Sequence, residues 1–220
     1  MDLTIENAEF LGIFVGDGSL HVRPEKAEFD FKFVGNPKDE FPYYFERVSK
    51  LASNLLGRQI CPSLMDKGRS IGIRFCSKEL ALCIGQIGIP KDKLNFADIP
   101  TCFLASKELT AAFIRGVFDT DGCFTIKKRY RKVPYYPCIE FGMKNKVLLG
   151  SIAIFINKYG ISSSLVVDQE YIDKRNGQKY TKNYLCIYGI KNVIKWFDLI
   201  GTSNPKIKEK WRNFISPASP

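Results

Sequence analysis

The sequence predicts an α+β fold made of two tandem repeats, each of the order αββαββα with its own four-stranded antiparallel sheet. The first observation is a repeated motif, because residues 10–18 read FLGIFVGDG and residues 114–122 read IRGVFDTDG. The second is that the same succession of alternating and helical segments follows both copies. The third is that glycines end the helices of the two halves at matching places: Gly57 and Gly88, then Gly160 and Gly201.

Period-two alternation predicts the strands of the first half. Residues 28–33 place Phe29, Phe31 and Phe33 on one face and charged side chains on the other. Residues 39–56 instead carry apolar side chains at helical spacing, beginning with Phe41 and Phe45. The segments predicted for this half are strands at 19–23, 28–33, 59–65 and 70–76 and helices at 39–56 and 78–86.

The second half repeats this order with a longer second hairpin, which contains the polar run at 170–182. Pro90 and Pro100 interrupt regular structure between the halves. We therefore expect an N-terminal repeat at 1–88, a linker at 89–105, and a C-terminal repeat with a tail at 106–220. The segments predicted for the second half are strands at 123–128, 136–141, 163–169 and 183–188 and helices at 146–159 and 191–199.

Charge and composition narrow the class of partner. The 220-residue chain has a formal net charge of +10, which favours a polyanionic partner and nucleic acid before membrane. Asp2 and Glu6 stand where a signal peptide would be basic, so we expect a protein that is not secreted. The cytoplasm beside the nucleoid, or an organellar matrix, is the expected location. One histidine, seven scattered cysteines and no CxxC pair argue against a structural zinc site.

Small residues in the two motifs predict a close helix pair. Gly12 and Gly16 lie four apart and share a helix face, and Gly116 and Thr120 do the same. Small side chains at this spacing let two helix backbones approach closely. The two motif helices should therefore pack along each other and deliver the acids that follow to one place.

Those acids, Asp17 and Asp121, would lie at helix C-termini, which carry partial negative charge and disfavour a second anion. A divalent cation resolves this conflict, and Mg²⁺ prefers oxygen ligands and completes its shell with water and phosphate. We therefore expect a metal site that includes Asp17, Asp121 and the adjacent Gly16 and Thr120, and metal-assisted phosphodiester hydrolysis. The alternative is that each Asp-Gly only ends a helix, although two matched copies disfavour it.

Both motifs resemble the LAGLIDADG motif, and the chain resembles a single-chain, two-motif LAGLIDADG homing endonuclease. The resemblance implies that Asp17 and Asp121 are the metal-binding acids. It also implies a basic residue after the fourth strand of each repeat, which matches Lys78 and Lys191 as catalytic candidates. Asp119 has no acidic mate in the first motif, where Val15 stands, so we expect Asp119 to be a polar partner at the helix end rather than a third catalytic acid. The family's glutamine after the second strand is absent, and Asn36 and Lys144 are its substitutes.

The polar faces of the eight strands should form a saddle that binds DNA. A β-ribbon fits the major groove, and strands of ~6–8 residues in two halves cover on the order of 12–15 base pairs. The candidates in the first half are His21, Arg23, Glu28, Asp30, Lys32, Arg69 and Arg74. Those in the second half are Thr125, Lys127, Arg129, Arg131, Lys132, Glu140, Lys174, Arg175 and Lys179.

The function that these observations predict is a monomeric, site-specific double-strand DNA endonuclease with Mg²⁺ as cofactor, for which Mn²⁺ or Ca²⁺ could substitute in binding. No small-molecule substrate and no membrane is expected. One alternative is a non-cleaving nucleic-acid-binding protein on the same scaffold, such as an intron RNA maturase or a DNA-binding regulator. Another is a basic interaction protein with no nucleic-acid role.

Overall fold

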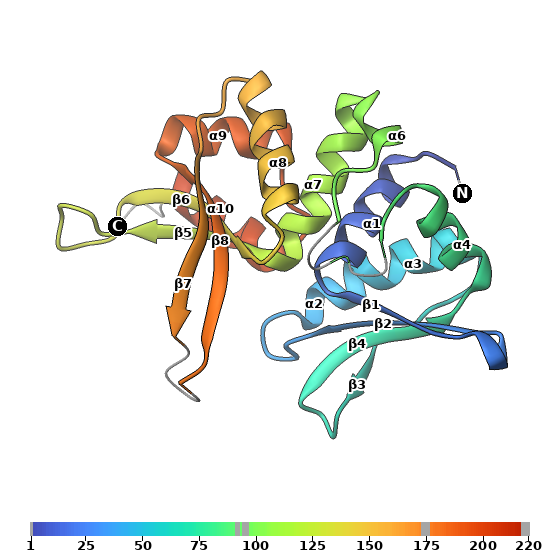
Figure 1. The fold of residues 1–220 in the computed structure, drawn as a ribbon. Coiled ribbons are helices and arrows are strands. Elements are labelled where there is room, and N and C mark those ends of the chain that lie inside the picture. Colours follow the sequence, from blue (N-terminus) through green and yellow to red (C-terminus); the bar gives the residue numbers. More distant parts are fainter. Residues whose placement is uncertain (1, 91–92, 94–96, 173–176, 217–220) are drawn as a thin grey trace.

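Two four-stranded antiparallel sheets flank a central pair of helices (Figure 1). The computed structural model describes residues 2–90, 93, 97–172 and 177–216. The central helices are α1 (Ile5–Gly16) and α7 (Lys107–Asp121), the two motif helices. The α+β architecture with two repeated halves is confirmed. Within the described ranges, no helix is long and apolar enough to cross a bilayer.

The two sheets have the same strand order and equivalent registers. In each sheet the first strand begins opposite a phenylalanine of the second, as Gly18 pairs with Phe33 and Gly122 with Phe141. The first sheet has the order β1 (Gly18–Arg23), β2 (Glu28–Gly35), β4 (Ser70–Cys76), β3 (Ser63–Met65). The second has the order β5 (Gly122–Lys127), β6 (Tyr136–Met143), β8 (Lys179–Tyr188), β7 (Ser164–Ile172).

The remaining helices cover the sheets on the side away from their polar faces (Figure 1). Gly57 and Gly201 follow α3 and α9 in the left-handed conformation (φ +60° and +70°), which glycine adopts without strain. The helices are α2 (Phe41–Tyr43), a π-helical turn (Tyr44–Val48), α3 (Ser49–Leu56), α4 (Lys78–Gln86), α6 (Thr101–Leu104), α8 (Lys146–Lys158), α9 (Ile190–Leu199) and α10 (Pro205–Ile215).

The core joins each sheet to its own motif helix. Phe10 of α1 packs against Phe33 of the first sheet, with ring centroids 5.1 Å apart. Phe118 of α7 packs against Phe141 of the second sheet and Trp196 of α9. Because α1 and α7 also pack on each other, the motif helices form one buried layer shared by both halves.

The structure corrects the predicted helix at 39–56. It begins at Phe41, and the π-helical turn inserts an extra residue that changes which side chains face the core. Tyr43 and Tyr44 are therefore buried, whereas Phe41 and Phe45 are 44% and 43% exposed.

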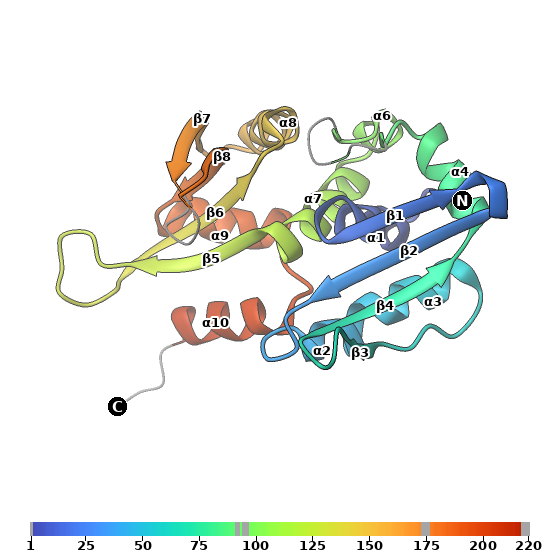
Figure 2. The ribbon, with the colours of Figure 1, turned by 60° about the horizontal axis from the view of Figure 1, so that its bottom comes forward.

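Other boundaries also differ from prediction. The two ends of the polar run at 170–182 are strand, since β7 continues to Ile172 and β8 begins at Lys179. The strand predicted at 59–65 is short and covers Ser63–Met65. Helices α6, in the linker, and α10, in the tail, were not expected. Figure 2 shows α10 beside β5, where Trp211 and Phe214 pack against Phe124.

Candidate active site

The packing of α1 on α7 brings the two predicted acids to one place. A Cβ atom added at Gly116 would lie 2.9 Å from the Gly12 Cα, so neither glycine leaves room for a side chain. A Cβ added at Gly16 would lie 3.4 Å from an Asp121 carboxylate oxygen. Asp17 caps α1, with its backbone N–H donating to the Ile13 carbonyl at 3.0 Å. Both carboxylates therefore lie at the same end of the helix pair, as the spacing of small residues predicts.

The environment of Asp17 disfavours its charge. Burial, followed by the negative charges of Glu40 and Asp121, raises the Asp17 pKa to about 7, while Lys93 opposes the rise. Glu40 is fixed nearby because its carboxylate accepts a hydrogen bond from the Asn36 N–H at 2.5 Å. The metal-free site thus holds an excess of negative charge on the Asp17 side.

Asp121 is less strongly perturbed. Its side chain reaches solvent, yet the protein around it partly desolvates the carboxylate and raises its pKa. Lys93 and Lys182 oppose that rise. The Asp121 side therefore has two nearby cations, and the Asp17 side shares only Lys93.

Lys93 is a candidate site residue that the sequence did not reveal. Its side chain is buried (9% exposed) and its Nζ donates to the Val15 carbonyl at 2.7 Å and the Gly16 carbonyl at 3.0 Å. These carbonyls belong to the last turn of α1 and have no partner within the helix. Burial lowers the Lys93 pKa to about 8, and both Asp121 and Asp17 oppose the decrease. A single lysine thus serves the helix end and both carboxylates.

The equivalent place at the end of α7 holds an amide. Asn204 Nδ2 donates to the Asp119 carbonyl at 3.2 Å, as Lys93 does to Val15. Asp119 itself is buried and accepts hydrogen bonds from the Thr202 hydroxyl and from the Ser203 N–H at 2.7 Å. Its expected role as a polar partner at the helix end therefore agrees with its surroundings.

Two of the cavities among the described residues lie near the ends of the motif helices, and Asp121 lines one of them. The first, of about 250 Å³, lies among Gly16, Lys93, Asp121 and the end of β6 from Gly142 to Asn145. The second, of about 330 Å³, is lined by the end of α7 including Thr120, by Glu40 and Asn36, and by Asn204 and Lys206. Asn36 and Lys144, the expected glutamine substitutes, thus line opposite cavities. The site has two distinct sides.

Lys78 and Lys191 do not lie beside the carboxylates. The backbone N–H of Ser77, which precedes Lys78, donates to the Phe29 carbonyl of β2. Phe29 lies four residues along β2 from Phe33, the residue that pairs with Gly18 beside Asp17. At about 3.3 Å per residue this is a separation of about 13 Å. In the second half, the backbone N–H of Gly189, which precedes the helix that carries Lys191, donates to the Pro137 carbonyl of β6. Both lysines are exposed in the first turns of their helices and remain candidates for phosphate contacts outside the centre.

The outward face of the first sheet is a set of charged pairs. Arg74 makes a bidentate ion pair with Asp30, at 2.7 Å for the closest contact. Arg23 pairs with Glu28 at 3.2 Å, and Lys32 approaches Asp66 at 3.8 Å. His21 faces Asp30 across the strands, and Arg69 donates to the Asp66 carbonyl in the β3–β4 turn. Such groups can exchange these partners for base edges and phosphates.

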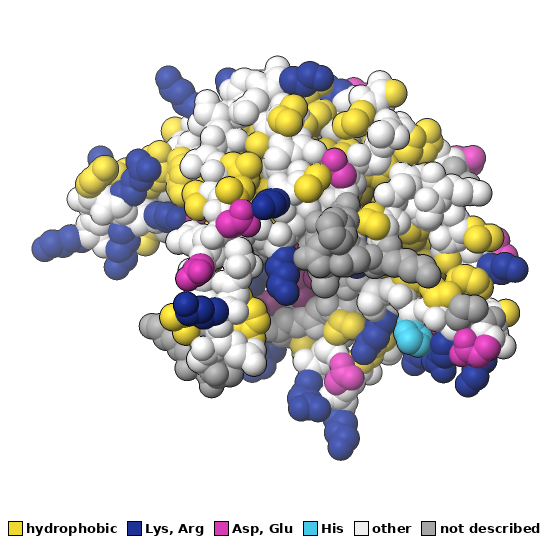
Figure 3. All heavy atoms as spheres, in the orientation of Figure 1, with side chains coloured by type: hydrophobic (Ala, Val, Ile, Leu, Met, Phe, Trp, Pro, Cys, Tyr) yellow, Lys and Arg dark blue, Asp and Glu magenta, His cyan; other side chains and the backbone are white. Residues whose placement is uncertain are grey.

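The outward face of the second sheet combines cations with tyrosines. Lys127 pairs with Glu140 at 2.6 Å, and Thr125 donates to the same carboxylate. Arg129 stacks 3.8 Å from the centre of the Tyr136 ring. Figure 3 shows Lys and Arg side chains gathered on the protruding β5–β6 loop. The remaining predicted contacts are Arg131 over Tyr135, exposed Lys132, and Lys179 near Glu170, while Lys174 and Arg175 lie outside the described residues.

The donor set fits a hard divalent cation that keeps part of its water shell. Within the described part of the chain, no group of three His, Cys, Asp or Glu side chains could hold a metal. The site offers the two carboxylates of Asp17 and Asp121, so other ligands must come from backbone carbonyls, water or substrate. Mg²⁺ is commonly bound by one or two carboxylates together with substrate phosphates.

Residues 108–201 match the family model of the LAGLIDADG-like domain. The chain is 26% identical over 219 residues to the replication factor C small subunit of Methanocaldococcus jannaschii, and 25% identical over 174 residues to a DNA polymerase of Thermococcus hydrothermalis. It covers 11% and 10% of the length of these relatives.

Solved structures share the fold across the whole chain. The structure of I-DmoI in complex with DNA and Ca aligns with a TM-score of 0.65 at 17% identity, covering 96% of this chain and all of the other. The LAGLIDADG homing endonuclease I-LtrWI, bound to target DNA, aligns with a TM-score of 0.57 at 13% identity, covering 97% and 89%. DUF199/WhiA from Thermatoga maritima aligns with a TM-score of 0.57 at 19% identity, covering 100% of this chain and 62% of the other. At these identities the likeness shows the fold.

Proposed function

We propose that the chain is a LAGLIDADG protein and that it acts as a site-specific double-strand DNA endonuclease that requires a divalent metal ion. The family model that matches residues 108–201 and the fold shared with I-DmoI and I-LtrWI support this proposal. The observation that carries the proposal is the placement of Asp17 and Asp121 together at the ends of the packed motif helices. Two partly desolvated carboxylates repel each other. Their juxtaposition is favourable once a divalent cation lies between them and DNA phosphate oxygens.

Mg²⁺ is the proposed cofactor, with Asp17 and Asp121 as its protein ligands. Crystal structures of I-DmoI with DNA include Ca, Mn and Mg, and we expect the same class of ion here. When bound, the ion supplies charge stabilisation for phosphodiester hydrolysis. Lys93 holds a second positive charge beside both carboxylates and can balance charge that develops on the phosphate.

The proposed substrate is duplex DNA laid along the outward faces of the two sheets. One chain carries both halves, so we expect it to act as a monomer. The two faces present different side chains at equivalent positions, and the target therefore need not be palindromic. The basic β5–β6 loop and the cations of the first sheet would neutralise phosphates on both sides of the centre.

A non-cleaving nucleic-acid binder on the same scaffold, such as an RNA maturase or a DNA-binding regulator, is the alternative. Binding alone gives no reason to keep two repelling acids at the point where the halves meet. That feature favours cleavage.

The test is selection of cut molecules from a random duplex pool in Mg²⁺. We expect the wild-type chain to enrich one long site and to cut both of its strands. A double variant, Asp17→Asn with Asp121→Asn, should bind this site with little change and leave it intact. Full cutting by the double variant would refute the assigned roles. Tight binding to duplex or RNA without any cutting by the wild type would favour the alternative.

A further inference from the structure

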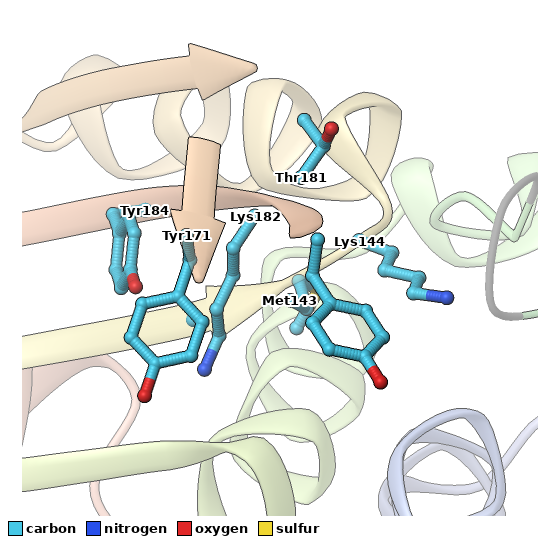
Figure 4. A pocket seen from close by; sticks show the side chains of 8 residues that line it. Met143, Lys144, Tyr171, Thr181, Lys182 and Tyr184 are labelled. Atoms are coloured by element: carbon cyan, nitrogen blue, oxygen red, sulfur yellow. The ribbon is translucent and has the colours of Figure 1, made fainter. Parts of the chain in front are cut away.

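A lysine on the second sheet reaches toward Asp121 through a gap that a glycine leaves. Lys182 and Tyr184 lie on β8 and Tyr171 on β7, around a cavity of about 500 Å³ at the end of β6 (Figure 4). A Cβ added at Gly142 of β6 would lie 2.8 Å from the Lys182 Cε and 3.1 Å from its Nζ. The Lys182 side chain therefore lies across the bare backbone of β6.

The position of Gly142 sets the direction of this lysine. Gly122 pairs with Phe141, so Gly142 is the next residue of β6 on the side of Asp121, and both residues line the 250 Å³ cavity. The Lys182 Nζ lies 5.6 Å from the centre of the Tyr184 ring. Lys144 points away from it in Figure 4. Among the described residues Lys182 makes no ion pair, so its charge is available to a ligand.

Within the part of the first half that the structure describes, no equivalent arrangement is found. Gly18 pairs with Phe33, so Val34, which carries a side chain, takes the place of Gly142. Gly72 pairs with Val34 as Tyr184 pairs with Gly142, which makes Ser70 the counterpart of Lys182. The Ser70 hydroxyl donates to Asp66 at 2.7 Å. Among the described residues, the lysine, the neighbouring ring and the open backbone position thus occur together beside Asp121 and not beside Asp17.

We infer that Lys182 is a further catalytic-centre residue, which contacts the DNA phosphate cleaved on the Asp121 side and has no counterpart on the Asp17 side. The inference rests on the proposed endonuclease function. An ammonium group acts on a phosphate as a point charge and needs no fixed geometry. Its effect falls off with distance, so it should act on one of the two scissile phosphates.

The experiment follows each strand separately during a single turnover, with saturating enzyme, Mg²⁺ and a duplex labelled at both ends. Lys182→Met should slow cleavage of one strand by about tenfold or more and leave the other within about twofold. Gly142→Ala keeps the charge but displaces it, so it should slow the same strand. Lys182→Arg should restore much of the rate. Lys158→Met, an exposed charge removal on α8 of the same half, is the matched control and should change neither rate.

Each outcome decides the inference. An equal loss on both strands, or no loss on either, would overturn it. Melting curves of Lys182→Met and Gly142→Ala separate a local effect from unfolding, because unfolding reduces both rates together. Absence of cutting by the wild-type chain would overturn the proposed function and this inference with it.

Discussion

The two halves of this molecule share a backbone and differ in the chemistry placed on it. Their sheets have the same strand order and register, and their motif helices approach at paired small residues. At the helix ends, however, Lys93 donates to two α1 carbonyls, whereas Asn204 donates to one α7 carbonyl, that of Asp119. The repeated backbone is set by packing, which tolerates no side chain at Gly12 or Gly116. The side chains around it are free to diverge, and the two sides of the site have become unequal.

The difference extends over the binding faces. The first face presents ion pairs such as Arg74 with Asp30, whereas the second presents cations stacked on tyrosines, such as Arg129 on Tyr136. Ion-paired groups can exchange partners with base edges, and stacked arginines keep their charge for phosphates. We therefore expect the first half to contribute more to base discrimination and the second more to overall affinity.

The largest expected effect concerns the close packing of α1 on α7, to which both halves contribute. Gly116→Ala should destabilise the protein by about 3 kcal/mol or more, because a Cβ there would lie 2.7 Å from the Ile13 backbone nitrogen and force the helices apart. Gly12→Ala should be equally damaging. Gly85→Ala on α4 and Gly150→Ala on α8, where nothing lies within 4 Å, should stabilise by about 0.5–1 kcal/mol. Urea unfolding measures all four, and equal effects would contradict close packing.

The next effect concerns the lysine that only one half supplies. Lys93→Met should reduce the single-turnover cleavage rate by about 100-fold, since it removes the cation beside both carboxylates. Binding to the target should change much less. Lys50→Met, on the exposed surface of α3, is the control for loss of one charge. A rate unchanged by Lys93→Met would mean that this lysine serves only the end of α1.

A pH effect should separate the two acids in metal-free protein. Because the Asp17 pKa is raised to about 7, its protonated form favours folding at low pH, and this contribution is lost as the pH rises through 7. Asp17→Asn should therefore raise the melting temperature at pH 8 by about 2–4 °C for each kcal/mol of repulsion removed, and by little at pH 4. Two lysines oppose the rise in the Asp121 pKa, so Asp121→Asn should gain less.

Thermal melts with and without Mg²⁺ check this effect. The ion should raise the melting temperature of the wild type more at pH 8 than at pH 4, and should raise that of Asp17→Asn less. If Asp17→Asn raised the melting temperature of the metal-free protein equally at pH 4 and pH 8, the result would contradict the repulsion described here.

The smallest expected effect concerns DNA binding by the outward faces of the two sheets. Arg74→Ala should cost about 1–3 kcal/mol of discrimination at one or two base pairs. Arg129→Ala should weaken binding to all sequences alike and reduce the salt dependence by about one phosphate contact. Binding to target and altered duplexes at two salt concentrations, in Ca²⁺, distinguishes these outcomes. Sequence-independent loss from Arg74→Ala would remove the proposed division between the halves.

Much of the fold follows from local pattern. Alternating phenylalanines at 29, 31 and 33 predict a strand with one buried face, and they are found in β2. Helix α4 begins and ends as predicted at 78 and 86, because Ser77 caps it and Gly88 follows in the left-handed conformation. Prediction was wrong where a helix changes its own register, as the π-helical turn at Tyr44–Val48 does. It was also incomplete where a tail helix depends on a distant partner, as α10 does on Phe124.

The sequence by itself determined the duplicated motif, the helix pair joined at small residues, and the meeting of Asp17 with Asp121, because helical spacing fixes which residues share a face. Only the tertiary structure decided which lysines approach these acids. Lys93 lies in the linker and Lys182 on β8, far along the chain from Asp17 and Asp121 respectively. No local pattern marks them, since the position of Lys93 depends on its contacts with the end of α1 and that of Lys182 on the absence of a side chain at Gly142.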